Sequence, residues 1–136
     1  MQIHESAEDY LETILLLHLR NGQVRSIDIV NEMGYSKPSI SVAMKRLREN
    51  GYIDMDEEGF ITLNPSGKAI AERIYARHRW LTKFLVTLGV SEKTAAIDAC
   101  KMEHDLSDET FECIKAHALA GNREVAKAAE TEESGA

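Results

Sequence analysis

One short stretch of the chain brings together three side chains that bind transition metals. In the segment Cys100-Lys101-Met102-Glu103-His104, the thiol, the carboxylate and the imidazole occupy positions i, i+3 and i+4. On an α-helix these positions share a face, so the three groups can converge. A ligand set of mixed softness suits a divalent transition ion better than calcium or magnesium, which take oxygen ligands. The spacing is compatible with a metal site, but taken alone it more often reflects a half-buried thiol beside solvated polar residues, so the rest of the chain must decide.

Composition limits the class of protein. The chain has 136 residues, 43% of them hydrophobic, which suits one ordinary domain or two small ones that share a core. It has no run of about 18 apolar residues, and residues 1–6 lack the basic and apolar regions of a secretory signal. We therefore expect a cytoplasmic protein without a membrane partner, in which Cys100 and Cys113 remain thiols.

Positive charge gathers in one segment of an acidic chain. The formal net charge is −7, yet residues 36–50 contain two lysines and two arginines against the single acid Glu49. A basic stripe on an acidic body is a surface that nucleic-acid phosphates can recognise. The apolar residues of the same segment are expected to form a mainly buried face on the opposite side of a helix: Ile40, Val42, Ala43, Met44 and Leu47.

The elements around this basic segment are those of a winged helix-turn-helix. Helices are predicted over residues 7–20, over a short stretch from Ser26 to Gly34, and from an N-cap at Ser36 to Asn50-Gly51. Two β-prone runs, residues 52–55 and 60–63, flank a turn sequence and predict a hairpin.

In a winged helix-turn-helix, the second helix of the motif enters the major groove of DNA. A winged helix that binds another protein is the alternative, and the cationic residues on the second helix favour DNA. The first turns of that helix are placed to reach base edges, and its later basic residues to reach phosphates. The predicted DNA-binding residues are Arg25, Ser36, Lys37, Pro38, Ser39, Ser41, Lys45, Arg46 and Arg48.

Three further helices are predicted after the hairpin. A long one follows Asn64 and closes at Gly89, a second runs from Ser91 to His104, and a third starts at Ser107. Helices that follow a DNA-binding unit usually form a dimer. The sequence thus predicts a mainly α fold in three parts: a winged helix-turn-helix domain at 1–64, an all-α dimerisation and metal-binding domain at 65–121, and a frayed polar tail at 122–136.

Four motifs, taken in order, resemble those of the metal-dependent repressors typified by the diphtheria toxin repressor and the manganese transport regulator. They are Glu8-Asp9-Tyr10-Leu11-Glu12-Thr13-Ile14, Tyr35-Ser36-Lys37-Pro38-Ser39, Arg77-His78 and Cys100-x-x-Glu103-His104-x-x-Ser107. The resemblance covers nearly all of residues 5–120. It implies a winged helix and an all-α dimerisation domain with the metal site between them, and no C-terminal SH3-like barrel. It also implies a homodimer that binds a palindromic operator in double-stranded DNA and represses metal-uptake genes when intracellular metal is sufficient.

The resemblance assigns six residues to the metal. They are Asp9, Glu12, His78, Cys100, Glu103 and His104. The spacing of Asp9 and Glu12 lets both carboxylates face one site, although acids in the first turn of a helix are also favoured by its dipole. His78 taken alone would more often be a partly buried polar residue. Metal bound to this set would tie the first helix to the later ones and set the spacing of two recognition helices across the dimer.

The ligand set combines features of two types of relative. Asp9 is typical of the manganese type and Cys100 of the iron type. We expect Fe(II) or Mn(II) as the cofactor, one or two ions per subunit, with Co(II), Ni(II) or Zn(II) as substitutes in vitro; the thiolate favours iron. Thr82 and Ala96 stand where the iron type needs a carboxylate and an imidazole for its ancillary site, so a paired site that shares Glu12 or His78 is the expected second position.

Two other classes of function remain open. A thiol-based redox-sensing winged-helix regulator would use Cys100 as its switch, and peroxide rather than metal removal would release its DNA. A metal-binding enzyme would show turnover without DNA binding. The sequence contains no nucleophile and base arrangement, so we predict no catalysis and no small organic ligand.

Overall fold

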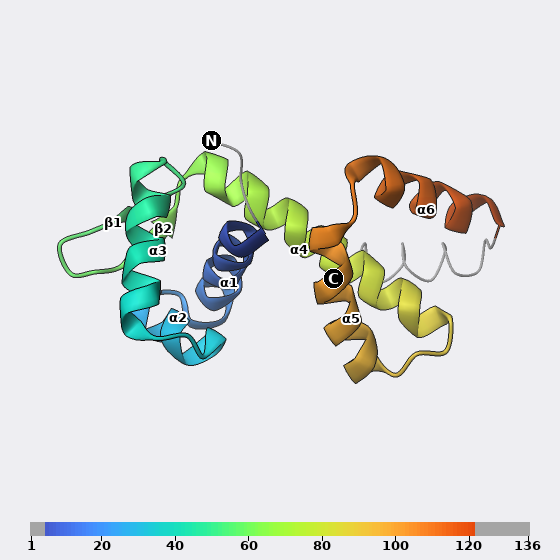
Figure 1. The fold of residues 1–136 in the computed structure, drawn as a ribbon, viewed down its shortest axis with the longest axis horizontal. Coiled ribbons are helices and arrows are strands. Elements are labelled where there is room, and N and C mark those ends of the chain that lie inside the picture. The colour runs from blue at the N-terminus through green and yellow to red at the C-terminus, as the bar shows by residue number, and fades with distance from the viewer. Residues whose placement is uncertain (1–4, 122–136) are drawn as a thin grey trace. The chain divides into compact units, whose positions relative to one another are not determined.

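The computed structural model describes residues 5–121, and over that range the chain is mainly α-helical (Figure 1). Its elements are α1 (Glu5–Asn21), α2 (Ser26–Met33), α3 (Lys37–Glu49), β1 (Ile53–Met55), β2 (Ile61–Leu63), α4 (Pro65–Thr87), α5 (Glu92–Asp105) and α6 (Asp108–Gly121). The predicted order of a winged helix-turn-helix followed by three helices is confirmed, and β1 and β2 are the only strands among the described residues. The predicted tail, residues 122–136, lies outside that range. None of the described helices has the length and apolarity needed to cross a membrane.

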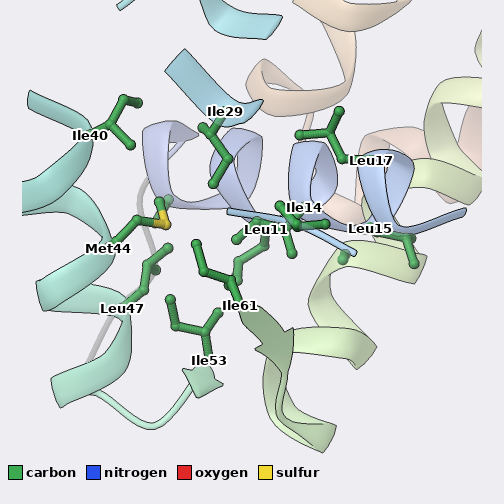
Figure 2. Close-up of a cluster of buried hydrophobic side chains, with 13 residues drawn as sticks. Leu11, Ile14, Leu15, Leu17, Ile29, Ile40, Met44, Leu47, Ile53 and Ile61 are labelled. Atoms are coloured by element: carbon green, nitrogen blue, oxygen red, sulfur yellow. The ribbon is translucent and has the colours of Figure 1, made fainter. Parts of the chain in front are cut away.

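The chain divides into two compact units inside α4, between Tyr75 and Ala76. In the N-terminal unit, apolar side chains of the helices and of both strands converge on one core (Figure 2). Among the side chains that are at most 2% exposed are Leu11, Ile14, Ile29, Ile40, Met44, Leu47, Ile53 and Ile61. Each contributes about 1.5–3 kcal/mol through removal of its surface from water. The core therefore holds α3 firmly by one face.

Local signals fix both ends of α3. Gly34 ends α2 in the left-handed region, with φ of 74°, and its N–H donates to the Val30 carbonyl at 2.9 Å. The Ser36 hydroxyl then accepts the Ser39 N–H at 3.3 Å, so the predicted N-cap is confirmed. The prediction that Val42 is buried is wrong. Its side chain is 53% exposed, because Val42 lies three and four residues from the exposed Ser39 and Arg46 and shares their face of the helix.

The hairpin forms the wing and is fastened to the helices. β1 and β2 pair antiparallel, with Ile53 opposite Leu63 and Met55 opposite Ile61. The Asp56 carboxylate closes the turn by accepting the N–H groups of Glu58 and Phe60, each at 2.9 Å. The Ile61 N–H donates to the Val24 carbonyl at 2.7 Å, which joins the wing to the segment before α2.

The C-terminal unit consists of the later part of α4 together with α5 and α6. Its core contains Trp80, Leu81, Ala99, Phe111 and Ala118. The Trp80 ring stacks on Phe84 with centroids 5.1 Å apart and meets Phe111 edge-on at 5.6 Å. Ser91 caps α5, as predicted, by accepting the Thr94 N–H.

Arg77 joins three parts of the C-terminal unit. Its side chain is 7% exposed, and Nη1 lies 3.1 Å from a carboxylate oxygen of Asp108 at the start of α6. Nη2 donates to the Leu106 carbonyl at 3.0 Å, and the guanidinium lies 4.5 Å from the centre of the Phe111 ring. These contacts fix the end of α5, and with it Glu103 and His104, against α4.

Candidate metal centre and nucleic-acid interface

A buried carboxylate in the C-terminal unit lies between two imidazoles. Glu103 Oε2 is 3.1 Å from Nδ1 of His78 on α4, and Oε1 is 3.4 Å from Nε2 of its neighbour His104 on α5. The side chains of Glu103, His104 and His78 are 0%, 2% and 26% exposed. An ionised carboxylate at this depth is costly unless positive charge compensates it.

The donor chemistry of this cluster fits a divalent ion. Despite the short distances, no residue that the structure describes gives either Glu103 oxygen a hydrogen bond of acceptable geometry. A carboxylate and two imidazoles are ligands that divalent iron and manganese accept, and an ion at this position would supply the charge that Glu103 needs. By burial and donor chemistry, the three residues therefore suit a divalent ion.

Cys100 lies one turn earlier on α5. Its side chain is exposed, as is that of Cys113, and neither cysteine forms a disulfide with a residue that the structure describes. The Cys100 Sγ and a ring nitrogen of His104 are within 4.8 Å of each other. The spacing that suggested a shared face thus places the thiol beside an imidazole, at the solvent-exposed edge of the cluster.

Two of the six assigned residues, Asp9 and Glu12, lie on α1 in the N-terminal unit. They are one turn apart, so their carboxylates project from the same side of the helix. Glu12 is 7% exposed, and Asp9 is half-buried. The same helix places Leu11 and Ile14 in the core of this unit, so α1 carries acidic groups on a face distinct from its packed one.

Tyr10, which lies between these two acids in the sequence, makes a contact with Tyr35 that the sequence did not indicate. Its ring meets that of Tyr35 edge-on with centroids 6.2 Å apart, so α1 touches the turn that precedes α3. Burial raises the pKa of the Tyr10 hydroxyl, and Tyr35 and Asp9 raise it further, so the group stays protonated at neutral pH.

Thr82 and Ala96 occupy the two positions at which iron-type relatives have the ligands of an ancillary metal site. The Thr82 hydroxyl donates to the His78 carbonyl at 2.7 Å, within α4. Ala96 has no donor atom in its side chain. Thr82 thus supports the backbone at His78.

The exposed surface of α3 is basic. All nine predicted DNA-binding residues are exposed. Lys45 makes only a long contact of 4.0 Å with Glu49, and Arg48 donates to the Met55 sulfur at 3.7 Å. These cations remain accessible to phosphates, since exposed pairs of this kind are weak. The guanidinium of Arg25 lies 4.2 Å from the centre of the ring of Phe60, the last residue of the turn between β1 and β2.

The tip of the wing has the opposite charge. Asp56, Glu57 and Glu58 are consecutive and exposed, so this turn repels phosphate. The exposed cations of this unit that could meet phosphates therefore lie on α3 and at Arg25 rather than at the wing tip. The three acids are evident in the sequence, but only the structure shows that the hairpin that carries them packs against α3.

Comparison with protein families gives two matches that follow one another along the chain. Residues 2–59 match the family model described as the iron-dependent repressor N-terminal DNA-binding domain. Residues 64–119 match that of the iron-dependent repressor metal-binding and dimerisation domain.

Two curated relatives illustrate the similarity. The transcriptional regulator MntR of Salmonella typhimurium is 36% identical over 112 residues, which cover 82% of this chain and 71% of the relative. An uncharacterised HTH-type transcriptional regulator of Methanocaldococcus jannaschii is 35% identical over 113 residues, or 82% of this chain and 90% of the relative.

Solved structures agree with the sequence matches. A manganese-dependent transcriptional repressor in complex with manganese superposes with a TM-score of 0.72 at 31% identity, over 81% of this chain and 51% of the other. The manganese regulator SloR superposes with a TM-score of 0.71 at 26% identity, over 88% of this chain and 55% of the other. The chain spans about half the length of these solved structures.

Proposed function

The chain belongs to the iron-dependent repressor family of transcription regulators, and from this premise we propose that it represses metal-uptake genes in response to intracellular Fe(II) or Mn(II). The observation that carries the proposal is the buried Glu103 carboxylate between His78 and His104. A bound cation would offset the cost of burying this carboxylate. The function is regulatory rather than enzymatic, and its location is the cytoplasm.

The proposed ligands are six side chains. They are Asp9, Glu12, His78, Cys100, Glu103 and His104. The bound ion would supply divalent positive charge to carboxylates, imidazoles and a thiolate, and either one or two ions per subunit are compatible with six ligands. Arg77 positions the end of α5 so that Glu103 and His104 stay directed at His78.

The proposed coupling runs through α1. This helix contributes Asp9 and Glu12 to the ligands and Leu11 and Ile14 to the core that also holds α3. A restraint on α1 is therefore a restraint on the whole DNA-binding unit. We assign residues 1–64 to DNA binding and residues 65–121 to dimerisation and metal binding. In a homodimer, two α3 helices then meet the half-sites of a palindromic operator, and metal and DNA affinities are reciprocally linked.

The metal is assigned from the donor atoms. The Cys100 thiolate gives manganese little advantage and favours iron, whereas the five carboxylate and imidazole ligands accept either ion. We propose Fe(II) as the physiological signal with Mn(II) as an alternative activator. Zn(II), Co(II) and Ni(II) bind such sets tightly, so these ions serve as substitutes in vitro and must be excluded in the cell by availability.

A DNA-shift assay under anaerobic conditions tests the proposal. We expect specific binding with Fe(II) or Mn(II) and its loss on addition of a chelator. His104→Ala should abolish metal activation, whereas His117→Ala, which removes an exposed imidazole from α6, should leave it intact.

Other outcomes of this assay separate the alternative functions. DNA binding that ignores the chelator but is lost with peroxide and retained in Cys100→Ser would establish a thiol switch instead. Equal metal activation in His104→Ala and His117→Ala would refute the ligand assignment.

A further inference from the structure

An apolar surface interrupts the polar face of α3. Val42 is 53% exposed, in the middle of the helix, with Ser39 one turn before it and Arg46 one turn after it. The valine does not stand alone. Together with Pro38 and with Ala7 and Tyr10 of α1 it lines an open hollow of about 490 Å³ in the N-terminal unit.

We propose that Val42 recognises a thymine of the operator through its C5-methyl group. In the major groove, that methyl group is the apolar feature by which one base pair is distinguished from the others. A valine side chain neither donates nor accepts a hydrogen bond, so on a DNA-facing helix it can discriminate bases only by such contact. This inference rests on the proposed function, since it requires α3 to enter the groove.

The surroundings of Val42 suit this role. Exposed cations on the same helix, Lys37, Lys45 and Arg46, complement the phosphates on either side of a base edge. The β-branched side chain has one strongly preferred rotamer in a helix, so the position of its methyl groups is fixed before binding. The side chain is 53% exposed, so its methyl groups can be contacted without displacement of the α3 backbone.

Replacement of thymine by uracil deletes only the proposed contact. Duplexes that the metal-loaded wild-type protein selects from a random-sequence pool would be resynthesised with uracil at one thymine at a time, or at a symmetric pair. At one such position we expect about a fourfold loss of affinity per half-site, the value of about 0.8 kcal/mol for one methyl-sized group. The same replacement should have no effect on Val42→Ala, which has lost the partner of the methyl group.

Two further variants make the experiment specific. Ile27→Ala removes an exposed aliphatic side chain from α2 in the same unit and should retain the full sensitivity to uracil. Val42→Thr keeps the β-branch and one methyl group and should retain part of it. Fluorescence anisotropy gives the affinities, and circular dichroism checks that each variant is folded.

The failures of this inference and of the proposed function are distinguishable. Specific binding that is insensitive to uracil at every thymine would overturn the role of Val42, as would sensitivity that persists unchanged in Val42→Ala. Absence of specific binding to any duplex, with and without metal, would overturn the proposed function and this inference together.

Discussion

Replacement of Glu103 by glutamine should have opposite effects on the apoprotein and on the metal-loaded protein. The substitution keeps the shape of the side chain and removes its charge. In the apoprotein, Glu103 is fully buried, with imidazole nitrogens at 3.1 and 3.4 Å. No residue that the structure describes gives this carboxylate a hydrogen bond, and a buried charge without one is costly. We therefore expect Glu103→Gln to leave the free energy of unfolding unchanged or to raise it.

With metal bound, the wild-type protein should become more stable than the Glu103→Gln variant. At a Mn(II) concentration of about 100 times its dissociation constant, binding stabilises the wild-type protein by about 2.7 kcal/mol. For a chain of this size that raises Tm by about 10 °C. Loss of a charged ligand should weaken binding at least about 100-fold, a factor that even outer-shell substitutions can reach. At the same Mn(II) concentration the variant then gains only about 0.4 kcal/mol, or about 1–2 °C.

Thermal unfolding with and without Mn(II) measures both effects. Glu112→Gln makes the same chemical change at an exposed position on α6 and should retain the full metal-induced rise in Tm. The reasoning is refuted if Glu103→Gln shows the wild-type rise in Tm, because Glu103 is then not a ligand. A variant that is strongly destabilised without metal would show instead that the carboxylate is already compensated by its two imidazole neighbours.

Three further changes test other parts of the structure. Arg46→Ala should weaken binding to all DNA sequences similarly and lower the slope of log K against log[salt] by about 1; an unchanged slope would remove Arg46 from the interface. Cys100→Glu should strengthen manganese-activated relative to iron-activated DNA binding in anaerobic titrations. An unchanged ratio of manganese-activated to iron-activated binding would show that Cys100 is not a metal ligand. Gly67→Ala would press its new Cβ against the Tyr52 carbonyl at the start of α4. Denaturant unfolding should show a loss of about 1–3 kcal/mol, whereas the exposed Lys68→Ala should cost less than about 0.5 kcal/mol.

Features that depend on neighbouring residues in the chain could be predicted from the sequence. Ser36 and Ser91 act as N-caps because a hydroxyl reaches a backbone N–H three residues later, a purely local interaction. The Asp56 turn is local in the same way, since its carboxylate binds N–H groups two and four residues ahead. The helices, the hairpin and the i, i+3, i+4 set on α5 followed from such signals.

Features that depend on distant residues could not be predicted. Helical spacing places Val42 on a face but does not say which face other elements cover, and here the core takes Ile40, Met44 and Leu47 instead. The burial of Glu103 was equally hidden, because an acid on a helix is normally solvated. Arg25 meets Phe60 across 35 positions of the chain, and the two were not linked by any sequence pattern.

The packing of the N-terminal unit determines how a metal signal could reach DNA under the proposed function. Leu11 and Ile14 of α1 share a core with Ile40 and Met44 of α3, and all four are at most 1% exposed. Such a core resists deformation, since the loss of even one methylene is costly. Tyr10 against Tyr35 adds a second contact between α1 and the turn before α3. A restraint on Asp9 and Glu12 would therefore leave the internal structure of the unit unchanged and alter its placement as a whole, so metal would act on the spacing of recognition helices and not on their folding.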